Sequence, residues 1–107
     1  MSRYRYWWRP NIVHALRCYM DLQDQRDQLA PEELRTMEAI EGALRDTEAL
    51  HNGAEIRSAV RFILMGRCSV SEYASSVYYS RTVVQRWLSQ FLLLVADRLG
   101  YLREADK

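Results

Sequence analysis

The sequence predicts an all-α fold of about five helices, with an N-terminal helical hairpin packed on a C-terminal trihelical unit that contains a helix-turn-helix. The chain has 107 residues but only four Gly and two Pro, and the strong helix formers Ala, Leu, Glu, Gln and Arg make up much of the rest. Apolar residues recur at three- and four-residue steps, the spacing of amphipathic helices. The length suits one domain. We therefore expect residues 1–107 to form a single domain, with a hairpin part (1–52) and a helix-turn-helix part (53–107).

Charged residues are unevenly distributed, although the formal net charge is only +1. Residues 1–20 carry four arginines and no acid, residues 21–48 carry nine acids against three arginines, and residues 55–98 carry six arginines against three acids. Such a pattern can place a basic face on a nearly neutral protein. Most of the cations are Arg, which binds phosphate and guanine in a bidentate manner, but a GC-rich genome produces the same bias and is the interpretation we favour.

No segment of the sequence predicts secretion, a membrane span or a metal site. The start, MSRYRYWWRP, lacks the apolar stretch of a signal peptide. The apolar run FLLLVA is far shorter than the roughly 20 residues of a span. Cys18 and Cys68 have no CxxC spacing, and the two histidines are isolated. We expect a cytoplasmic protein of a bacterial host cell with reduced thiols, no cofactor, no metal and no membrane partner.

Two helices are expected in the N-terminal half. The first covers residues 11–28 and follows Pro10, and Ala30-Pro31 ends it because Pro disfavours helical geometry in the residue before it. The second begins at Pro31 with acids in its first turn. The sequence His51-Asn52-Gly53 is the predicted stop, since Gly or Asn past the last turn commonly ends a helix. The short link between the helices predicts an antiparallel hairpin.

Three helices are expected in the C-terminal half. The first covers residues 54–65, the last covers residues 81–99, and each is followed by Gly. Between them lies a short helix that Ser69 or Ser71 caps and that continues to about residue 77. The last helix is apolar over much of its circumference and must be covered on several sides. In so small a chain, we expect part of that cover to come from a homodimer.

The stretch SEYASSVYYSRTVVQRWLS, residues 71–89, has the features of a helix-turn-helix. Two short helices that cross steeply around a tight turn need a small residue at the crossing point, and Ala74 supplies it. Apolar residues at set distances from Ala74 form the small core, and the hydroxyl of Ser80 can cap the second helix.

The outward side chains of this second helix are of the types that recognise double-stranded DNA. Arg can bind guanine in a bidentate manner, Gln can pair with adenine, and Ser and Thr can contact bases or phosphates. Side chains on the preceding elements are expected to hold phosphates and so set the register. The residues expected to bind DNA are Ser80, Arg81, Thr82, Gln85, Arg86 and Ser89 on this helix and Ser71, Arg57, Arg61 and Arg67 before it.

The string SVSEYASSVYYSRTVVQRW resembles the helix-turn-helix of sigma-factor region 4, and more narrowly that of small phage and prophage regulators of the ArpU/RinA type. Taken from the helix at 55–65 to residue 101, the similar region covers nearly half of the chain. The resemblance implies a sequence-specific transcriptional regulator of phage or mobile-element origin, with its recognition helix at residues 80–89. Such turns usually carry Gly where this chain has Tyr78, because a left-handed backbone is convenient there. Tyr78 either adopts that conformation at a cost or the turn differs.

Other interpretations stay open at this point. The outward side chains also suit an ordinary solvated helix face. The nine acids within residues 21–48 indicate either a solvated surface or a contact with a protein partner. In the second case, the chain would be a small phage protein that binds and inhibits a host protein such as RNA polymerase or a CRISPR nuclease. A small terminase-like packaging protein, which uses a similar unit in a ring, is a further alternative. The aromatic N-terminal segment is either a nucleic-acid arm or a cap on the core, which we favour. No enzyme is expected, because no Gly-rich phosphate loop, HExxH motif or nucleophile elbow occurs.

Overall fold

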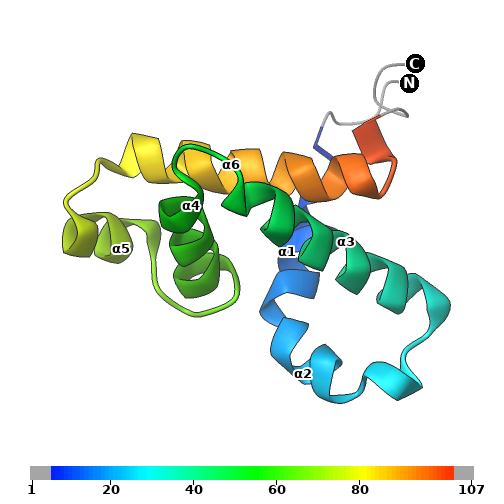
Figure 1. Cartoon of the computed structure of the whole chain (residues 1–107). Coiled ribbons are helices and arrows are strands. Elements are labelled where there is room, and N and C mark those ends of the chain that lie inside the picture. The colour runs from blue at the N-terminus through cyan, green and yellow to red at the C-terminus, as the bar shows by residue number, and fades with distance from the viewer. Residues whose placement is uncertain (1–5, 103–107) are drawn as a thin grey trace.

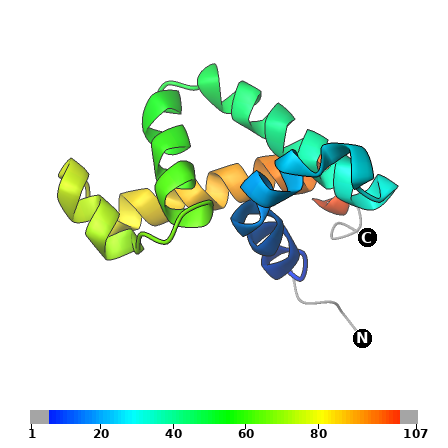
Figure 2. The same cartoon turned by 90° about the horizontal axis from the view of Figure 1, so that it is seen from below.

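The computed structural model describes residues 6–102, which fold into helices joined by short connections (Figures 1 and 2). The prediction of an all-α fold is confirmed, since no strand occurs within residues 6–102. None of the described helices is both long enough and apolar enough to cross a bilayer. The elements in chain order are α1 (Arg9–Arg17), α2 (Tyr19–Asp24), the 3-10 turn η1 (Arg26–Gln28), α3 (Pro31–Glu48), α4 (Gly53–Ala59), the π-helical segment η2 (Val60–Leu64), α5 (Val70–Val77) and α6 (Arg81–Arg98).

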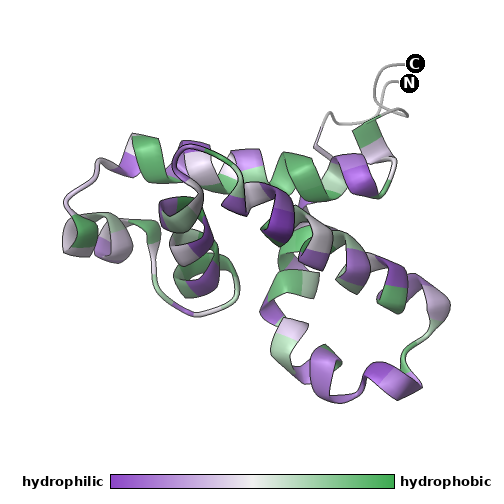
Figure 3. Ribbon diagram, viewed as in Figure 1, coloured by the Kyte–Doolittle hydropathy of each residue, from purple (hydrophilic) through white to green (hydrophobic). Residues whose placement is uncertain are grey.

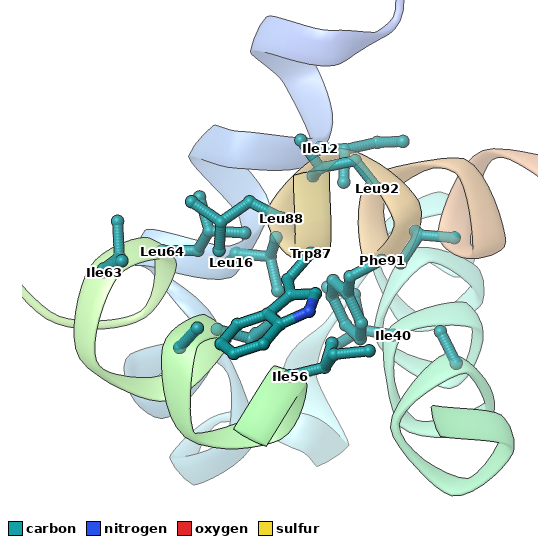
Figure 4. Close-up of a cluster of buried hydrophobic side chains, with 14 of the residues drawn as sticks. Ile12, Leu16, Ile40, Ile56, Ile63, Leu64, Trp87, Leu88, Phe91 and Leu92 are labelled. Atoms are coloured by element: carbon teal, nitrogen blue, oxygen red, sulfur yellow. The ribbon is translucent and has the colours of Figure 1, made fainter. Parts of the chain in front are cut away.

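Helix α6 is one of two helices of 18 residues, and α1, α3, α4, α5 and η2 pack on it. In Figure 1 its N-terminal half lies over α4 and α5, and its C-terminal half lies along α3 and α1. Figure 4 shows Trp87 and Phe91 of α6 at the centre of the core, with Leu16, Ile40 and Ile56 reaching them from three other helices. Apolar and polar residues alternate along each helix in Figure 3, as expected of helices that bury one face.

The breadth of the apolar face of α6 is explained by packing within the chain. Phe91 and Val95 are fully buried, and α1, α3, α4 and α5 all contact the helix. Among the large apolar side chains of α6, only Leu93 is exposed, to 37%. The broad apolar face of α6, which favoured a homodimer, is therefore explained without one. The homodimer stays a prediction that no longer has this support.

The first helix is not the continuous helix predicted over residues 11–28. α1 ends at Arg17, and Cys18 has a non-helical backbone with φ −93° and ψ 1°. The chain then resumes as the short α2 and the turn η1. Tertiary contacts with α3 follow the break: the Tyr19 hydroxyl donates to Glu41 at 3.1 Å, and Arg26 donates to both oxygens of the same carboxylate at 3.0 and 2.9 Å.

The stop between α3 and α4 lies close to where it was predicted but acts differently. α3 ends at Glu48 with Ala49 as a right-handed C-cap, and Gly53 is the first residue of α4 rather than a left-handed cap. Glycine is needed there because a Cβ atom would collide with the carbonyl oxygen of Thr47. The constraint is therefore a close approach of two backbone segments.

The C-terminal helices follow the prediction closely. Ser69, and not Ser71, caps α5, accepting the Glu72 N–H at 3.1 Å. Helix α4 continues into η2, where the Met65 N–H donates to the carbonyl of Val60 five residues back, at 2.9 Å. Gly100, with φ 80°, follows the end of α6.

The contacts that attach α2 and η1 to α3 lower the pKa of Glu41. The hydrogen bonds from Arg26, and to a lesser degree from Tyr19, hold the pKa of Glu41 below its ordinary value. Burial and the hydrogen bond to Glu41 raise the pKa of Tyr19. A carboxyl group with a lowered pKa in the folded state contributes stability above its unfolded pKa and loses it as the pH falls through its folded pKa.

We expect the free energy of unfolding to fall more steeply between about pH 5 and about pH 3 in the wild type than in Glu41→Gln, which cannot titrate at this position. Urea unfolding at several pH values in this window measures the difference. Glu38→Gln is the matched control, because Glu38 is an exposed carboxylate of the same helix with no hydrogen-bonded partner in the described chain. Equal slopes in the wild type and Glu41→Gln would contradict a stabilising role for this contact.

Candidate nucleic-acid interface

The helix-turn-helix is formed by α5 and the first turns of α6. Ala74 is buried, and its carbonyl accepts the Tyr79 N–H at 3.1 Å, which closes the turn. The Tyr79 ring packs edge-on against Trp87 of α6 with 4.8 Å between ring centroids. The Ser80 hydroxyl accepts the Val83 N–H at 3.2 Å, as predicted for the cap of α6. The angle at which α6 leaves the turn is thus fixed by both polar and aromatic contacts.

Tyr78 adopts the left-handed conformation that such turns usually assign to Gly. Its backbone has φ 62° and ψ 33°, and its residue surface is 95% exposed. For a residue with a Cβ atom, this conformation costs roughly 1–2 kcal/mol. Of the two alternatives for the turn, the structure therefore shows that Tyr78 adopts the left-handed conformation at a cost. The exposed ring returns none of this cost through packing.

Four side chains on the first turns of α6 form one exposed polar surface, which we call the recognition face. Within the described chain, none of the four makes a hydrogen bond or an ion pair. Residues four apart on a helix are neighbours, so these side chains form two adjacent rows. The recognition face consists of Arg81, Thr82, Gln85 and Arg86.

The electrostatic character of the recognition face is positive. Its two arginines stand near the N-terminus of α6, where the helix dipole adds further positive potential. Helix α6 carries no acid before Asp97, near its opposite end. An anionic ligand would therefore meet several unneutralised donors there.

Ser89 lies beyond the recognition face and is half-buried against the N-terminal segment. It lines a small cavity with Tyr6, Trp8 and Arg9. Trp8 is 1% exposed, and its ring meets that of Tyr6 edge-on at 5.8 Å.

Trp7 packs against Tyr101 with 5.0 Å between ring centroids. Tyr6, Trp7 and Trp8 thus cover the core, as the cap interpretation requires, whereas Tyr4 lies outside the described residues. Arg9, a cation of the segment for which a nucleic-acid arm was the alternative, is exposed and lines the cavity with Ser89, one helical turn beyond Gln85. No local signal in the sequence links residue 9 to residue 89.

The residues expected to hold phosphates are dispersed over two surfaces. Arg67 is exposed before α5, and Ser71 is exposed in its first turn. Arg57 and Arg61 instead line a groove between α4 and α2, and Arg57 forms an ion pair with Glu48 at 2.6 Å. No residue of the recognition face lines that groove. The structure therefore does not bring Arg57 and Arg61 together with the side chains of the recognition face.

Comparisons with protein-family models, with curated proteins and with solved structures found no match to this chain. The function is therefore inferred from the fold and from the side chains that it exposes.

We expect Tyr78→Gly to raise the free energy of unfolding by about 1 kcal/mol. The substitution removes the left-handed cost of roughly 1–2 kcal/mol, and the greater freedom of Gly in the unfolded chain offsets about 0.5–1 kcal/mol of it. Tyr78→Ala is the matched control, because it removes the exposed ring but keeps the Cβ atom, and it should leave stability nearly unchanged. Urea unfolding measures both variants. A loss of stability in Tyr78→Gly would show that the ring contributes to the fold.

Proposed function

We propose that this protein is a sequence-specific DNA-binding transcriptional regulator in which α6 is the recognition helix. The observation that carries the proposal is the recognition face, an unpaired basic and polar surface at the start of a helix whose opposite side is fixed in the core. A helix presented in this way suits insertion into the major groove of double-stranded DNA.

The stability of α6 alone does not account for this choice of residues. A helix is stabilised by acids in its first turn and cations in its last turn, yet α6 has Arg81 at its first position and no acid in its first turn. An ordinary solvated face also tends to pair opposite charges at four-residue steps, whereas Arg86 has no acid on α6 within that distance. The arginines are therefore better explained by an external anion.

The roles within the interface follow from the side-chain chemistry. Arg81, Gln85 and Arg86 are proposed to contact base edges, and Thr82 a base or a phosphate. Contacts to phosphates are proposed for the exposed groups that flank the turn and the recognition face. These groups are Ser71, Ser80 and Arg67, together with Arg9 beside Ser89.

The resemblance of residues 69–87 to sigma-factor region 4 extends the proposal to promoter DNA. The likeness to regulators of the ArpU/RinA type further favours a phage or another mobile element as the origin. Both statements rest on the helix-turn-helix string and on the helix at 55–65 that precedes it.

The test is selection from randomised duplexes, followed by fluorescence-anisotropy binding of the enriched motif at two salt concentrations. We expect one enriched motif and an affinity that falls as salt rises, because phosphate contacts release counterions. Arg81→Ala and Arg86→Ala should each cost about 1–3 kcal/mol at one base position and relax the preference there. Arg45→Ala, an exposed arginine of α3, makes the same change of charge elsewhere and should retain both affinity and specificity.

Two outcomes would contradict the proposal at different levels. No DNA binding at the lower salt concentration would reject DNA as the ligand. Wild-type affinity and specificity in Arg86→Ala would reject that residue's role while leaving the function in place. Light scattering on the same sample gives the oligomer mass, and a large ring would favour the terminase-like alternative.

A further inference from the structure

A wide groove is lined by residues of both halves of the chain. Its volume is about 820 Å³, and it lies between α2 and α3 on one side and α4 and η2 on the other. Figure 1 shows α4 and α2 on the two sides of this space. The groove shares no lining residue with the recognition face.

Two large apolar side chains in the groove are exposed to solvent. Met20 of α2 is 63% exposed and Phe62 of η2 is 53% exposed, and the half-buried Leu44 and Met65 lie with them in the same groove. Exposed apolar side chains that gather in one concavity are typical of interaction sites. Methionine also adapts its shape readily to a partner.

The polar residues of the groove give it a positive charge. Arg57 and Arg61 line it, and no acid does. Glu48 neutralises Arg57 through their ion pair, whereas Arg61 has no ion-pair partner within the described residues. The groove thus combines an apolar lining with one free cation.

The sides of the groove are held in place by contacts that two of its lining residues make with the rest of the chain. On one side, the hydrogen bond from Tyr19 to Glu41 fixes the start of α2 on α3. On the other side, the Phe62 ring stacks on Tyr73 with 5.9 Å between centroids and an interplanar angle of 29°. A preformed site of this kind loses little conformational freedom when it binds.

We propose that this groove binds an amphipathic α-helix of a partner protein, with apolar residues against Met20 and Phe62 and a row of carboxylates against Arg61. Helices that dock in apolar grooves do so through residues at three- and four-residue steps, and the charge of the groove selects acids along one edge of the helix. DNA is a poor occupant because its phosphate backbone offers no apolar surface for Met20 or Phe62.

A second copy of this chain is also a poor occupant. The apolar stripes of the described helices are buried within the chain, and the exposed large apolar residues do not form a stripe on any one of them. The proposal removes Arg61 from the expected phosphate contacts. It stands independently of DNA binding by α6.

The test uses the full chain and synthetic, dye-labelled amphipathic helices of about 18 residues, five turns of α-helix. One peptide carries Leu and Phe at three- and four-residue steps with Glu along one edge, and its partner carries Lys in place of Glu. We expect the Glu peptide to bind about tenfold more tightly in fluorescence anisotropy, a difference of about 1.4 kcal/mol. Arg61→Glu should reverse the preference, and Met20→Lys should weaken binding of the Glu peptide.

Arg86→Glu on the recognition face is the matched control and should leave peptide binding unchanged. Urea unfolding of each variant shows whether it is folded. Equal affinity for the two peptides would overturn the proposal, as would a preference that Arg61→Glu does not alter. Loss of DNA affinity in Arg61→Glu with unchanged peptide binding would instead make Arg61 a phosphate contact. A concentration-dependent rise in mass that Met20→Lys abolishes would make a second copy the occupant.

Discussion

The burial of one long face of α6 is the constraint on which the rest of the structure depends. An 18-residue helix is roughly 27 Å long, and no other single helix of the described chain covers that face. Helices α4 and α5 cover its first half, and α1 and α3 cover its second half. The recognition face is the part of the first turns that this arrangement leaves uncovered. The groove has the same origin, because the two sets of helices that pack on α6 contact each other through α3 and α4 and through α1 and η2, but leave an open space beside α2.

Polar contacts fix the C-terminal end of α6 on α3. Arg98 donates to Asp46 at 3.0 and 2.8 Å, and Arg35 donates to the Leu99 carbonyl at 3.0 Å, which satisfies an acceptor at the end of α6. Gly42 lies directly under the guanidinium group of Arg98, where a Cβ atom would meet the Nε atom at 2.8 Å. The close passage of Arg98 over α3 therefore depends on the absence of a side chain at residue 42.

Local signals in the sequence predicted the C-terminal half well. Ser80 acts within three residues of its own position, so the start of α6 was predictable from neighbouring residues alone. The break at Cys18 is instead accompanied by contacts with Glu41, which is distant in sequence, and the role of Gly53 depends on the path of the backbone at Thr47. The breadth of the apolar face of α6 was predictable. Which helices cover that face was not, because hydrophobic burial is non-directional and a sequence does not show which element supplies the contact. For the same reason, the sequence did not show that Arg61 lies in a groove away from the recognition face.

Several exposed residues are unfavourable for the free chain, and their positions argue for function more strongly than residue type does. Tyr78 has a left-handed backbone and an exposed ring, and Arg81 stands at the positive end of a helix. Met20 and Phe62 leave apolar surface in water. Unfavourable features of this kind concentrate at ligand-binding sites, because the free energy of binding compensates for the stability that they cost the free chain. Here they fall on two surfaces of different chemistry, one exposed and polar at the start of α6, the other an apolar groove. A single ligand cannot match both, so the proposals of a DNA duplex on α6 and of a partner helix in the groove do not compete with each other.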